Sequence, residues 1–314
     1  NKLFRNIFAI GDALGMPAEF LSHTQIIQHY HGIITDFVVP FCGHPNDSQQ
    51  PGQYTDDTQL MLAVAESVLD KKGVDCKDIS KKFVKLHREG IKGIGRTTRK
   101  AINKLAKGKS WQESGIMSGG CGGATKTIHL GLLYGLGQQY LNALVSDAED
   151  VCRITHTDTR AIVGAIYIAS AISYLKNKVH SYNFNVNEFL TASSAFIENI
   201  EVEKEVEETL SDKVLYVKQL IGVGHDKAVK NLNLTGFTYD VILASLYAFL
   251  RSPLDFEKSV ITAVNLGGDT DSVGALTGAL SGALNGYNAI PSRWKYHVKD
   301  AERLVNAGTG LYKL

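Results

Sequence analysis

The chain has 314 residues and a hydrophobic content of 44%, which is ordinary for a globular protein. Its net charge of +1 argues against nucleic acid or an anionic membrane surface as a partner. Four cysteines without C-x-x-C spacing exclude a dense disulfide framework, so we expect reduced thiols and a cytoplasmic location. The longest apolar run, residues 161–175, is shorter than the ~20 residues of a membrane span and predicts a core helix.

Helices are the expected building blocks, because the chain has six prolines and apolar stretches rich in alanine, leucine and isoleucine. Residues 4–20 predict a helix that Pro17 bends or ends. Residues 23–52 are rich in turn-forming residues and predict a loop, with an extended piece over residues 33–39. Residues 71–109 are basic and predict helices interrupted by a turn.

Two segments place carboxylates and hydroxyls at the start of a nearly all-apolar helix. In the first, Thr55 can cap a helix whose first turn contains two aspartates. In the second, residues 265–286, glycine recurs every fourth residue from Gly274 to Gly286, and a ridge without side chains lets another helix approach closely. Together the two segments contribute Thr55, Asp56, Asp57, Asp269, Asp271 and Ser272.

A buried helix carries its first turn toward the protein interior, where a carboxylate needs a partner to remain charged. If these aspartates and Glu19 converge, each close pair repels by roughly 4 kcal/mol at about 4 Å and an effective dielectric constant of about 20. A divalent cation removes this repulsion, and oxygen ligands favour Mg²⁺ or Mn²⁺ over Zn²⁺. The other interpretation is that each helix start is an ordinary cap with acids that suit the helix dipole.

A glycine-rich loop and a polar turn are the remaining candidates for ligand binding. The loop, residues 118–126, lacks a Walker ending, but its backbone N–H groups can surround a phosphate; a plain flexible turn is equally compatible. In the turn, residues 156–158, Thr157 or Asp158 caps the helix that follows. His156 either orients a ligand or satisfies its own helix start.

The rest of the chain indicates packing rather than chemistry. The acidic run over residues 197–210 predicts a solvated helix face. Residues 237–250 predict an apolar helix, and residues 294–306 predict a closing helix. No low-complexity linker divides the chain, so we expect one domain over residues 1–314.

The motifs GDALGMPAEF, YTDDTQLML, SGGCGGATK, ITHTDTR and NLGGDTDSVGALTGALSG occur in this order. Over residues 11–286 the chain thereby resembles the ADP-ribosylglycohydrolase family, which includes dinitrogenase-reductase-activating glycohydrolases and ADP-ribosyl-acceptor hydrolases. The resemblance implies a compact all-α fold with a binuclear Mg²⁺ or Mn²⁺ centre at the floor of an ADP-ribose cleft. By motif position it implies metal ligands at Thr55, Asp56, Asp57, Asp269, Asp271 and Ser272, with Glu19 near the metals. It also implies that the cleft is lined by Gly119, Gly120, Cys121, Gly122, Gly123, Ala124, His156 and Asp158.

Three positions in the glycine-rich loop depart from the family's pattern. Thr125 and Lys126 stand where Met-Arg is common, and Cys121 stands where asparagine is frequent. Lysine lacks the planar, two-pronged contact of arginine, so we expect a different or weaker contact from Lys126. Residues 90–98 also lack an acidic residue that some arginine-directed members carry nearby, which bears on the choice of acceptor.

The resemblance predicts a metal-dependent hydrolase that cleaves the bond between ribose C1″ and an acceptor, with protein arginine as the expected acceptor and ADP-ribose as the product. Glu19, or Asp57 through a metal-bound water, is the expected general acid or base. Two Mg²⁺ or Mn²⁺ ions are the expected cofactors, and an ADP-ribosylated protein or small molecule is the expected partner. The alternatives are a catalytically inactive ADP-ribose-binding or structural, crystallin-like relative, and a phosphohydrolase that uses the same metal site.

Overall fold

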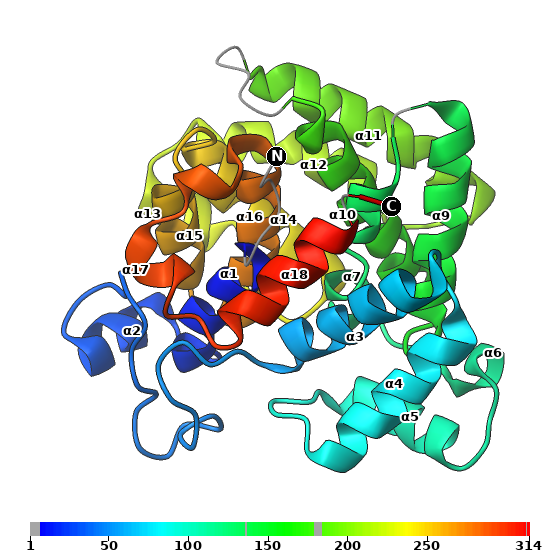
Figure 1. The fold of residues 1–314 in the computed structure, drawn as a ribbon. Coiled ribbons are helices and arrows are strands. Elements are labelled where there is room, and N and C mark those ends of the chain that lie inside the picture. The colour runs from blue at the N-terminus through cyan, green and yellow to red at the C-terminus, as the bar shows by residue number, and fades with distance from the viewer. Residues whose placement is uncertain (1–6, 136, 179–183, 312) are drawn as a thin grey trace.

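The computed structural model describes residues 7–135, 137–178, 184–311 and 313–314. Within these ranges the chain folds into helices and no strand forms, so the all-α prediction is confirmed (Figure 1). The α-helices are α1 (Ile7–Gly15), α2 (His23–Tyr30), α3 (Asp56–Lys71), α4 (Cys76–Glu89), α5 (Arg96–Ala106), α6 (Trp111–Ser114), α7 (Gly122–Thr125), α8 (Leu130–Leu133), α9 (Gln138–Arg153), α10 (Thr159–Lys176), α11 (Val186–Glu203), α12 (Leu210–Ile221), α13 (His225–Lys230), α14 (Thr238–Arg251), α15 (Phe256–Val264), α16 (Thr270–Asn285), α17 (Ser292–Lys295) and α18 (Ala301–Leu311). Two 3₁₀ turns cover Met16–Ala18 and Tyr287–Ala289.

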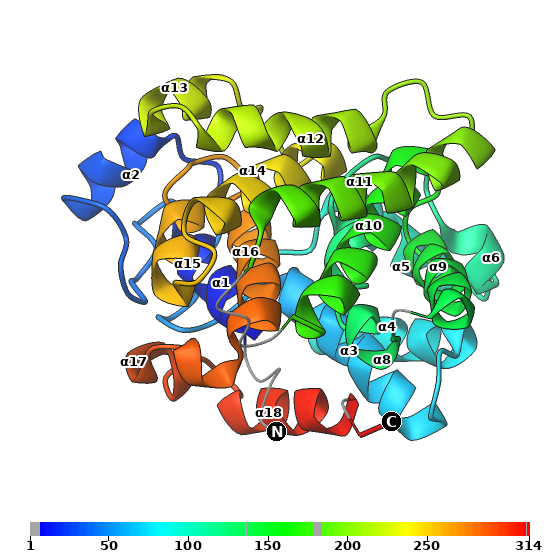
Figure 2. The ribbon, with the colours of Figure 1, turned by 90° about the horizontal axis from the view of Figure 1, so that it is seen from above.

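Helix α16 lies at the centre of the fold and is buried over residues 270–284 (Figure 2). Its glycines let α1 approach to backbone contact. A Cβ at Gly274 would overlap the carbonyl oxygen of Gly11, and a Cβ at Gly278 would overlap that of Ile7. The prediction that the glycine ridge serves close packing is therefore confirmed. Glycine costs a helix about 0.8–1 kcal/mol relative to alanine, and this contact between helices is the compensation.

Replacing Gly274 with alanine is expected to lower the free energy of unfolding by roughly 1–3 kcal/mol, because the added methyl group would overlap the backbone of α1. Urea denaturation followed by circular dichroism measures the change. Gly73→Ala is the matched control, since the space around Gly73 is open. Equal effects of the two substitutions would contradict close packing as the reason for glycine at position 274.

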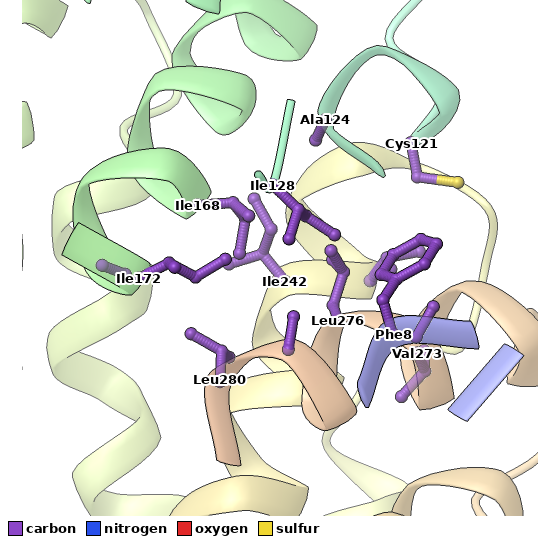
Figure 3. Packing of buried hydrophobic residues seen from close by; sticks show 14 of the residues in the cluster. Phe8, Cys121, Ala124, Ile128, Ile168, Ile172, Ile242, Val273, Leu276 and Leu280 are labelled. Atoms are coloured by element: carbon purple, nitrogen blue, oxygen red, sulfur yellow. The ribbon is translucent and has the colours of Figure 1, made fainter. Parts of the chain in front are cut away.

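Side chains from α10 and α14 complete the core beside α16. Ile168, Ile172, Ile242 and Leu276 are buried and gather in one cluster, which Figure 3 shows. Residues 161–175, which predicted a core helix, lie within α10 and are buried apart from Tyr174. In the part of the chain that the structure describes, none of the helices combines the length and the hydropathy of a bilayer span.

The N-terminal helix forms as predicted within the described residues. Helix α1 is followed by a 3₁₀ turn with Pro17 at its start, while residues 4–6 of the predicted helix lie outside the described ranges. The loop predicted from position 23 is wrong at its start, where α2 forms. Ser22 and Gln25 make a capping box there, since each side chain bonds the other's backbone N–H.

Residues 33–39, predicted as an extended piece, pair with no neighbouring strand in the described part of the chain. The amide side chain of Asn265 instead accepts from the backbone N–H of Ile34 at 2.7 Å and donates to its carbonyl at 2.8 Å. A side chain from just before α16 thus takes the place of a neighbouring strand. This contact holds the early loop against the segment that leads into α16.

The acidic run over residues 197–210 is not a uniformly solvated face. It covers the end of α11 and the turn before α12, and Glu201 is only 2% exposed. The Glu201 carboxylate accepts hydrogen bonds from the backbone N–H groups of Leu210 and Ser211, at the start of α12. A carboxylate suits the unpaired donors of a helix N-terminus. The prediction of a solvated face is therefore wrong at Glu201.

The later helices agree with the sequence in all but one case. Residues 237–250 lie almost entirely in α14, and residues 71–109 form α4 and α5 with a turn between them. The predicted closing helix, residues 294–306, is instead divided between α17 and α18. Asp300 lies in the interruption with a positive φ of 54°, and it accepts a hydrogen bond from the Tyr54 hydroxyl at 2.7 Å.

Candidate active site

The carboxylate of Asp57 joins the start of α3 to the end of α7 and to the start of α16. Asp57 lies in the first turn of α3, where Thr55 caps the helix by accepting a hydrogen bond from the Asp57 N–H at 3.4 Å. One carboxylate oxygen of Asp57 accepts from the Thr125 hydroxyl at 2.8 Å, and the other accepts from the Ser272 hydroxyl at 2.7 Å. These two bonds tie α3 to α7 and to the start of α16.

Glu19, Asp269 and Asp271 form an acidic cluster at the start of α16. Each offers one carboxylate oxygen, and these oxygens lie within 4.8 Å of one another. The two aspartates flank the start of α16, while Glu19 follows the turn that ends α1. Two backbone hydrogen bonds of 2.8 Å between residues 20–21 and Gly268 hold the segments side by side. Side chains about 250 positions apart in the chain thereby meet.

One carboxylate oxygen in this cluster has no partner. Asp271 is 5% exposed, and its Oδ1 receives no hydrogen bond from any residue in the described ranges. An unsatisfied buried carboxylate is costly, so a cation or a donor is expected at this position. The candidate ligand atoms are the carboxylate oxygens of this cluster and the hydroxyls of Thr55 and Ser272, which belong to the starts of α3 and α16. Such an all-oxygen set fits Mg²⁺ or Mn²⁺.

Burial and mutual repulsion raise the pKa values of these carboxyls. Burial, followed by the charge of Asp269, raises the pKa of Glu19 to about 8 and that of Asp57 to about 6. Burial is also the main cause that holds the pKa values of Asp56 and Asp271 well above their usual range. These carboxyl groups cannot all be ionised at neutral pH unless a cation balances their negative charge.

Asp12 belongs to the same acidic region, although sequence reasoning missed it. It is fully buried on α1 and accepts hydrogen bonds from the backbone N–H groups of Thr55 at 2.9 Å and Thr58 at 3.1 Å. Burial, followed by the charge of Asp57, raises the pKa of Asp12 to about 7. Asp12 thus fixes the start of α3. The available signal was a lone aspartate inside an otherwise apolar helix.

The glycine-rich loop contacts the acidic cluster through Cys121. Its thiol donates to Asp269 Oδ2 at 3.2 Å, and its sulfur lies 3.4 Å from Ser272 Oγ. Cys121 is 9% exposed. The loop predicted as a ligand contact is therefore adjacent to the groups predicted as metal ligands.

The backbone of the loop is held by residues 236–238. Cys121 N–H donates to the carbonyl of Gly236 at 3.0 Å, and Thr238 N–H donates to that of Gly119 at 2.9 Å. A Cβ at Gly119 would overlap the Phe237 ring. A larger residue at position 119 would therefore have to displace the Phe237 ring, which is 46% exposed.

Lys126 is fully buried and is held by its own loop and by Thr155. Its ammonium donates to the carbonyl of Gly122 and to the Thr155 hydroxyl, each at 2.6 Å. Burial lowers the pKa of Lys126 to about 8, which leaves it protonated at neutral pH. Because an ammonium only donates, the Thr155 hydroxyl proton is directed to His156 Nδ1, 2.8 Å away. His156 therefore accepts at Nδ1 and carries its proton on Nε2.

The Nε2 of His156 faces the glycine-rich loop. A Cβ at Gly120 would lie 3.5 Å from this nitrogen, and one at Gly122 would lie 3.8 Å from it. Burial and the nearby charge of Lys126 hold the pKa of His156 well below its usual range, so the ring is neutral. A ligand that lies over the loop would thus meet one N–H donor from His156.

Replacing Thr155 with valine is expected to release His156 from this tautomer, because the hydroxyl that links it to Lys126 is lost. Nitrogen-15 NMR of the histidine ring measures the tautomer directly. In Thr155→Ser, which keeps the hydroxyl, the ring signals should match those of the wild type. Identical signals in Thr155→Val and the wild type would contradict the hydrogen-bond relay.

Asp158 has structural partners. It caps α10 by accepting a hydrogen bond from the Arg160 N–H at 2.9 Å, and it also binds the Arg160 guanidinium at 3.0 and 2.8 Å. The hydrogen bonds from Arg160 hold the pKa of Asp158 below its usual range. Arg160 in turn lies over the Phe237 ring, 5.1 Å from its centroid. Of the two caps considered for this helix, the structure has Asp158 and not Thr157.

An all-helical protein that gathers carboxylates and hydroxyls beside a glycine-rich loop is a candidate hydrolase with a metal site. The profile of the ADP-ribosylglycohydrolase family matches residues 8–314, so the chain belongs to this family and the resemblance in its motifs is confirmed. Membership in the family indicates a hydrolase that removes ADP-ribose.

The comparisons cover nearly the whole chain. An uncharacterized protein of Archaeoglobus fulgidus is 36% identical over 99% of this chain and 96% of its own. ADP-ribosylarginine hydrolase Tri1 of Serratia proteamaculans is 27% identical over 97% of this chain and 76% of its own. ADP-ribosylhydrolase ARH3 of Homo sapiens is 23% identical over 97% and 90%. A solved structure described as an ADP-ribosylglycohydrolase-related protein complex has a TM-score of 0.73 and 27% identity, and it covers 98% of this chain and 94% of its own.

Proposed function

We propose that this protein hydrolyses the bond between ribose C1″ of ADP-ribose and an acceptor, with protein arginine as the first acceptor to test, and that it needs divalent cations to do so. The observation that carries the proposal is the convergence of Glu19, Asp269 and Asp271 around an unpartnered carboxylate oxygen. The relative named ADP-ribosylarginine hydrolase, 27% identical to this chain, supports arginine as the acceptor.

The proposed ligands of two Mg²⁺ or Mn²⁺ ions are Thr55, Asp56, Asp57, Asp269, Asp271 and Ser272. When bound, such ions supply positive charge that stabilises developing negative charge and orients substrate oxygens. The hydrogen bonds from Thr125 and Ser272 to Asp57 fix the orientation of its carboxylate. Asp12 fixes the start of α3 by accepting hydrogen bonds from the N–H groups of Thr55 and Thr58.

Glu19 is the stronger candidate for the general acid or base. Its Oε2 accepts one hydrogen bond, from Asn46 Nδ2 at 2.8 Å, and within the described residues its Oε1 accepts none. Both oxygens of Asp57, by contrast, already accept hydroxyl hydrogen bonds. A carboxyl group that moves a proton needs an oxygen free to reach the reacting atom. This difference favours Glu19 over Asp57.

The glycine-rich loop and His156 are the proposed ADP-ribose contacts. Within the described residues, the backbone N–H groups of Gly119 and Gly122 donate to no protein acceptor, whereas those of the other four residues from 119 to 124 do. These two N–H groups would donate to the diphosphate, and the His156 Nε2–H would donate to a diphosphate or ribose oxygen. Lys126 would act at one remove, by fixing the loop carbonyls and the His156 tautomer. In this arrangement Lys126 replaces the two-pronged contact of an arginine with a positioning role.

The test is to incubate the protein and Mg²⁺ with ADP-ribose linked to arginine, to serine or to nucleic acid, and to measure free ADP-ribose. We expect release from the arginine-linked substrate. Release from the serine-linked substrate alone would change the proposed acceptor from arginine to serine and would support hydrolysis at ribose C1″. Tight binding of ADP-ribose without release from any substrate would indicate a binding or structural relative, and phosphate release from nucleotides would indicate a phosphohydrolase.

A further inference from the structure

The basic residues of this chain are concentrated in one segment. Residues 71–109 contain 14 lysines and arginines and three acidic residues, a net charge of +11. The rest of the chain contains 19 basic and 29 acidic residues, a net charge of −10. The whole-chain charge of +1, which argued against nucleic acid as a partner, is therefore an average over two oppositely charged parts.

This segment forms a projecting layer of the fold. Helices α4 and α5 pack against each other and α6 adjoins both, at one edge of the molecule in Figure 1. A groove of about 690 Å³ runs along this layer. Its lining includes Lys77, Lys81, Lys85, Arg88, Lys109 and Trp111. None of the residues proposed for the active site lines this groove.

The lysines of α4 are arranged as a row along one helix face. Lys77, Lys81 and Lys85 are four residues apart and exposed, and Arg88 continues the row. Like charges at this spacing repel one another and destabilise a helix. Among the described residues, the only carboxylate within 4.0 Å of these four side chains is Glu89, 3.8 Å from Lys85. A row of four cations that lowers helix stability and has one counter-charge, Glu89, fits an external polyanion better than a solvated face.

Trp111 favours nucleic acid over an acidic protein surface as the polyanion that binds this groove. Its indole ring is half-buried at the start of α6 and lines the same groove as the four cations of α4. A groove that combines cations for a phosphate backbone with an aromatic surface for a base is the arrangement that binds single-stranded nucleic acid. Trp111 packs partly against the core, and the part of its ring that remains uncovered faces the groove. An acidic protein surface would use the cations alone, whereas a nucleic acid would also use this part of the ring.

We propose that the α4–α6 groove binds single-stranded nucleic acid, with phosphates on Lys77, Lys81, Lys85 and Arg88 and a base stacked on Trp111. The binding is independent of the proposed hydrolase activity, since the two sites share no residue. It gives the protein a second recognition surface, through which it is localised on RNA or DNA.

The test uses fluorescence anisotropy with labelled oligo(dT) and oligo(rU) of about 15 nucleotides in roughly 50 mM salt, a length and an ionic strength suited to one binding groove. We expect binding of at least one oligonucleotide, with log K falling by about 0.7 per unit of log salt for each phosphate contacted. A preference between the two probes assigns the partner as DNA or RNA. Absence of binding to both would overturn the proposal.

Charge-matched variants separate this groove from general basicity. The triple variant Lys77→Glu, Lys81→Glu, Lys85→Glu should weaken binding about 10- to 100-fold. Its control replaces three exposed lysines of α12 and α13 with glutamate, at Lys218, Lys227 and Lys230, and therefore has the same net charge. Equal weakening in both would overturn the proposal. So would competition by polyglutamate as effective as that by unlabelled oligonucleotide, which would indicate an acidic protein partner.

Trp111 provides a test that charge does not affect. Trp111→Leu should weaken binding roughly fivefold or more with an unchanged salt dependence, whereas Trp111→Phe should retain most of it, because stacking needs a ring. Circular dichroism and thermal unfolding show whether each variant is folded. Equal affinities of the two Trp111 variants would contradict base stacking. The proposed active-site variant Asp271→Asn should bind the oligonucleotide normally, so failure of the hydrolase proposal leaves this result unaffected.

Discussion

Substitution of Asp271 by asparagine is expected to reduce ADP-ribose release more than ~100-fold, beyond the upper range for residues that only orient a metal ligand. The same substitution should stabilise the metal-free protein. Its Oδ1 is buried without a partner, and its neighbours are Glu19 and Asp269. Asparagine removes the cost of burying and protonating a carboxyl group beside Glu19 and Asp269, which raises the unfolding temperature by about 2–4 °C for each kcal/mol recovered. A loss of ADP-ribose release together with a higher unfolding temperature would identify Asp271 as part of a binding site, because loss of a structural contact would lower the unfolding temperature.

Asp226→Asn is the matched control, because Asp226 is exposed on α13 and does not belong to the acidic cluster. It should change neither the activity nor the unfolding temperature. Full turnover in Asp271→Asn would remove Asp271 from the proposed metal site. A fall in the unfolding temperature of metal-free Asp271→Asn would show that this carboxylate stabilises the fold without a cation.

The metal-free protein is expected to lose stability as pH rises from about 5 to about 8, and Mg²⁺ or Mn²⁺ should restore it. Burial and mutual repulsion raise the pKa values of Asp57, Asp12 and Glu19 to about 6, 7 and 8. The folded state therefore binds more protons than the unfolded state above pH ~4. This contribution to stability is complete below the unfolded pKa values and is lost as pH rises through the folded ones.

Thermal unfolding at several pH values, with and without divalent cation, measures this coupling. At a cation concentration 1,000 times Kd, linkage gives about 4 kcal/mol, a rise in unfolding temperature on the order of 10 °C. Sodium chloride of equal ionic strength controls for screening. A metal-free protein that becomes more stable toward pH 8, or a divalent cation that acts no better than sodium, would contradict the proposed cation site.

The parts of this site that the sequence predicts are those with a local signature. Thr55 caps the helix that begins at Asp56, and Asp269 and Asp271 flank the start of α16, as the order of residues along the chain indicated. The glycine ridge also predicts a close helix contact from spacing alone. Its partner, α1, could not be predicted in this way, because nothing local in α16 specifies which helix will carry Gly11.

The residues that sequence reasoning missed act over long distances. Asp12 bonds to Thr58, 46 positions away, and only the folded chain shows that an aspartate in an apolar helix has partners. The composition of residues 197–210 predicts that Glu201 is exposed, although it accepts hydrogen bonds from the start of α12. The start of α2 is a different case. The glycines and prolines of residues 23–52 predict a loop, whereas the capping box between Ser22 and Gln25 is a local signal that begins a helix.

The convergence of distant segments is the feature that local patterns could not supply. Glu19, Asp57 and Asp269 come from three parts of the chain, and the order of family motifs, rather than spacing, indicated that they meet. The same limit applies to the basic groove, where Trp111 is an unremarkable residue in the sequence. It gains meaning only beside the cations of α4.

The most direct test of a metal-dependent active site is ADP-ribose release from arginine-linked ADP-ribose by the wild type with Mg²⁺, by the wild type with EDTA, and by Asp271→Asn with Mg²⁺. We expect release in the first reaction and none above background in the other two, with EDTA inhibition reversed by excess Mg²⁺ or Mn²⁺. Equal release in all three reactions would contradict the claim that these carboxylates form a metal-dependent active site.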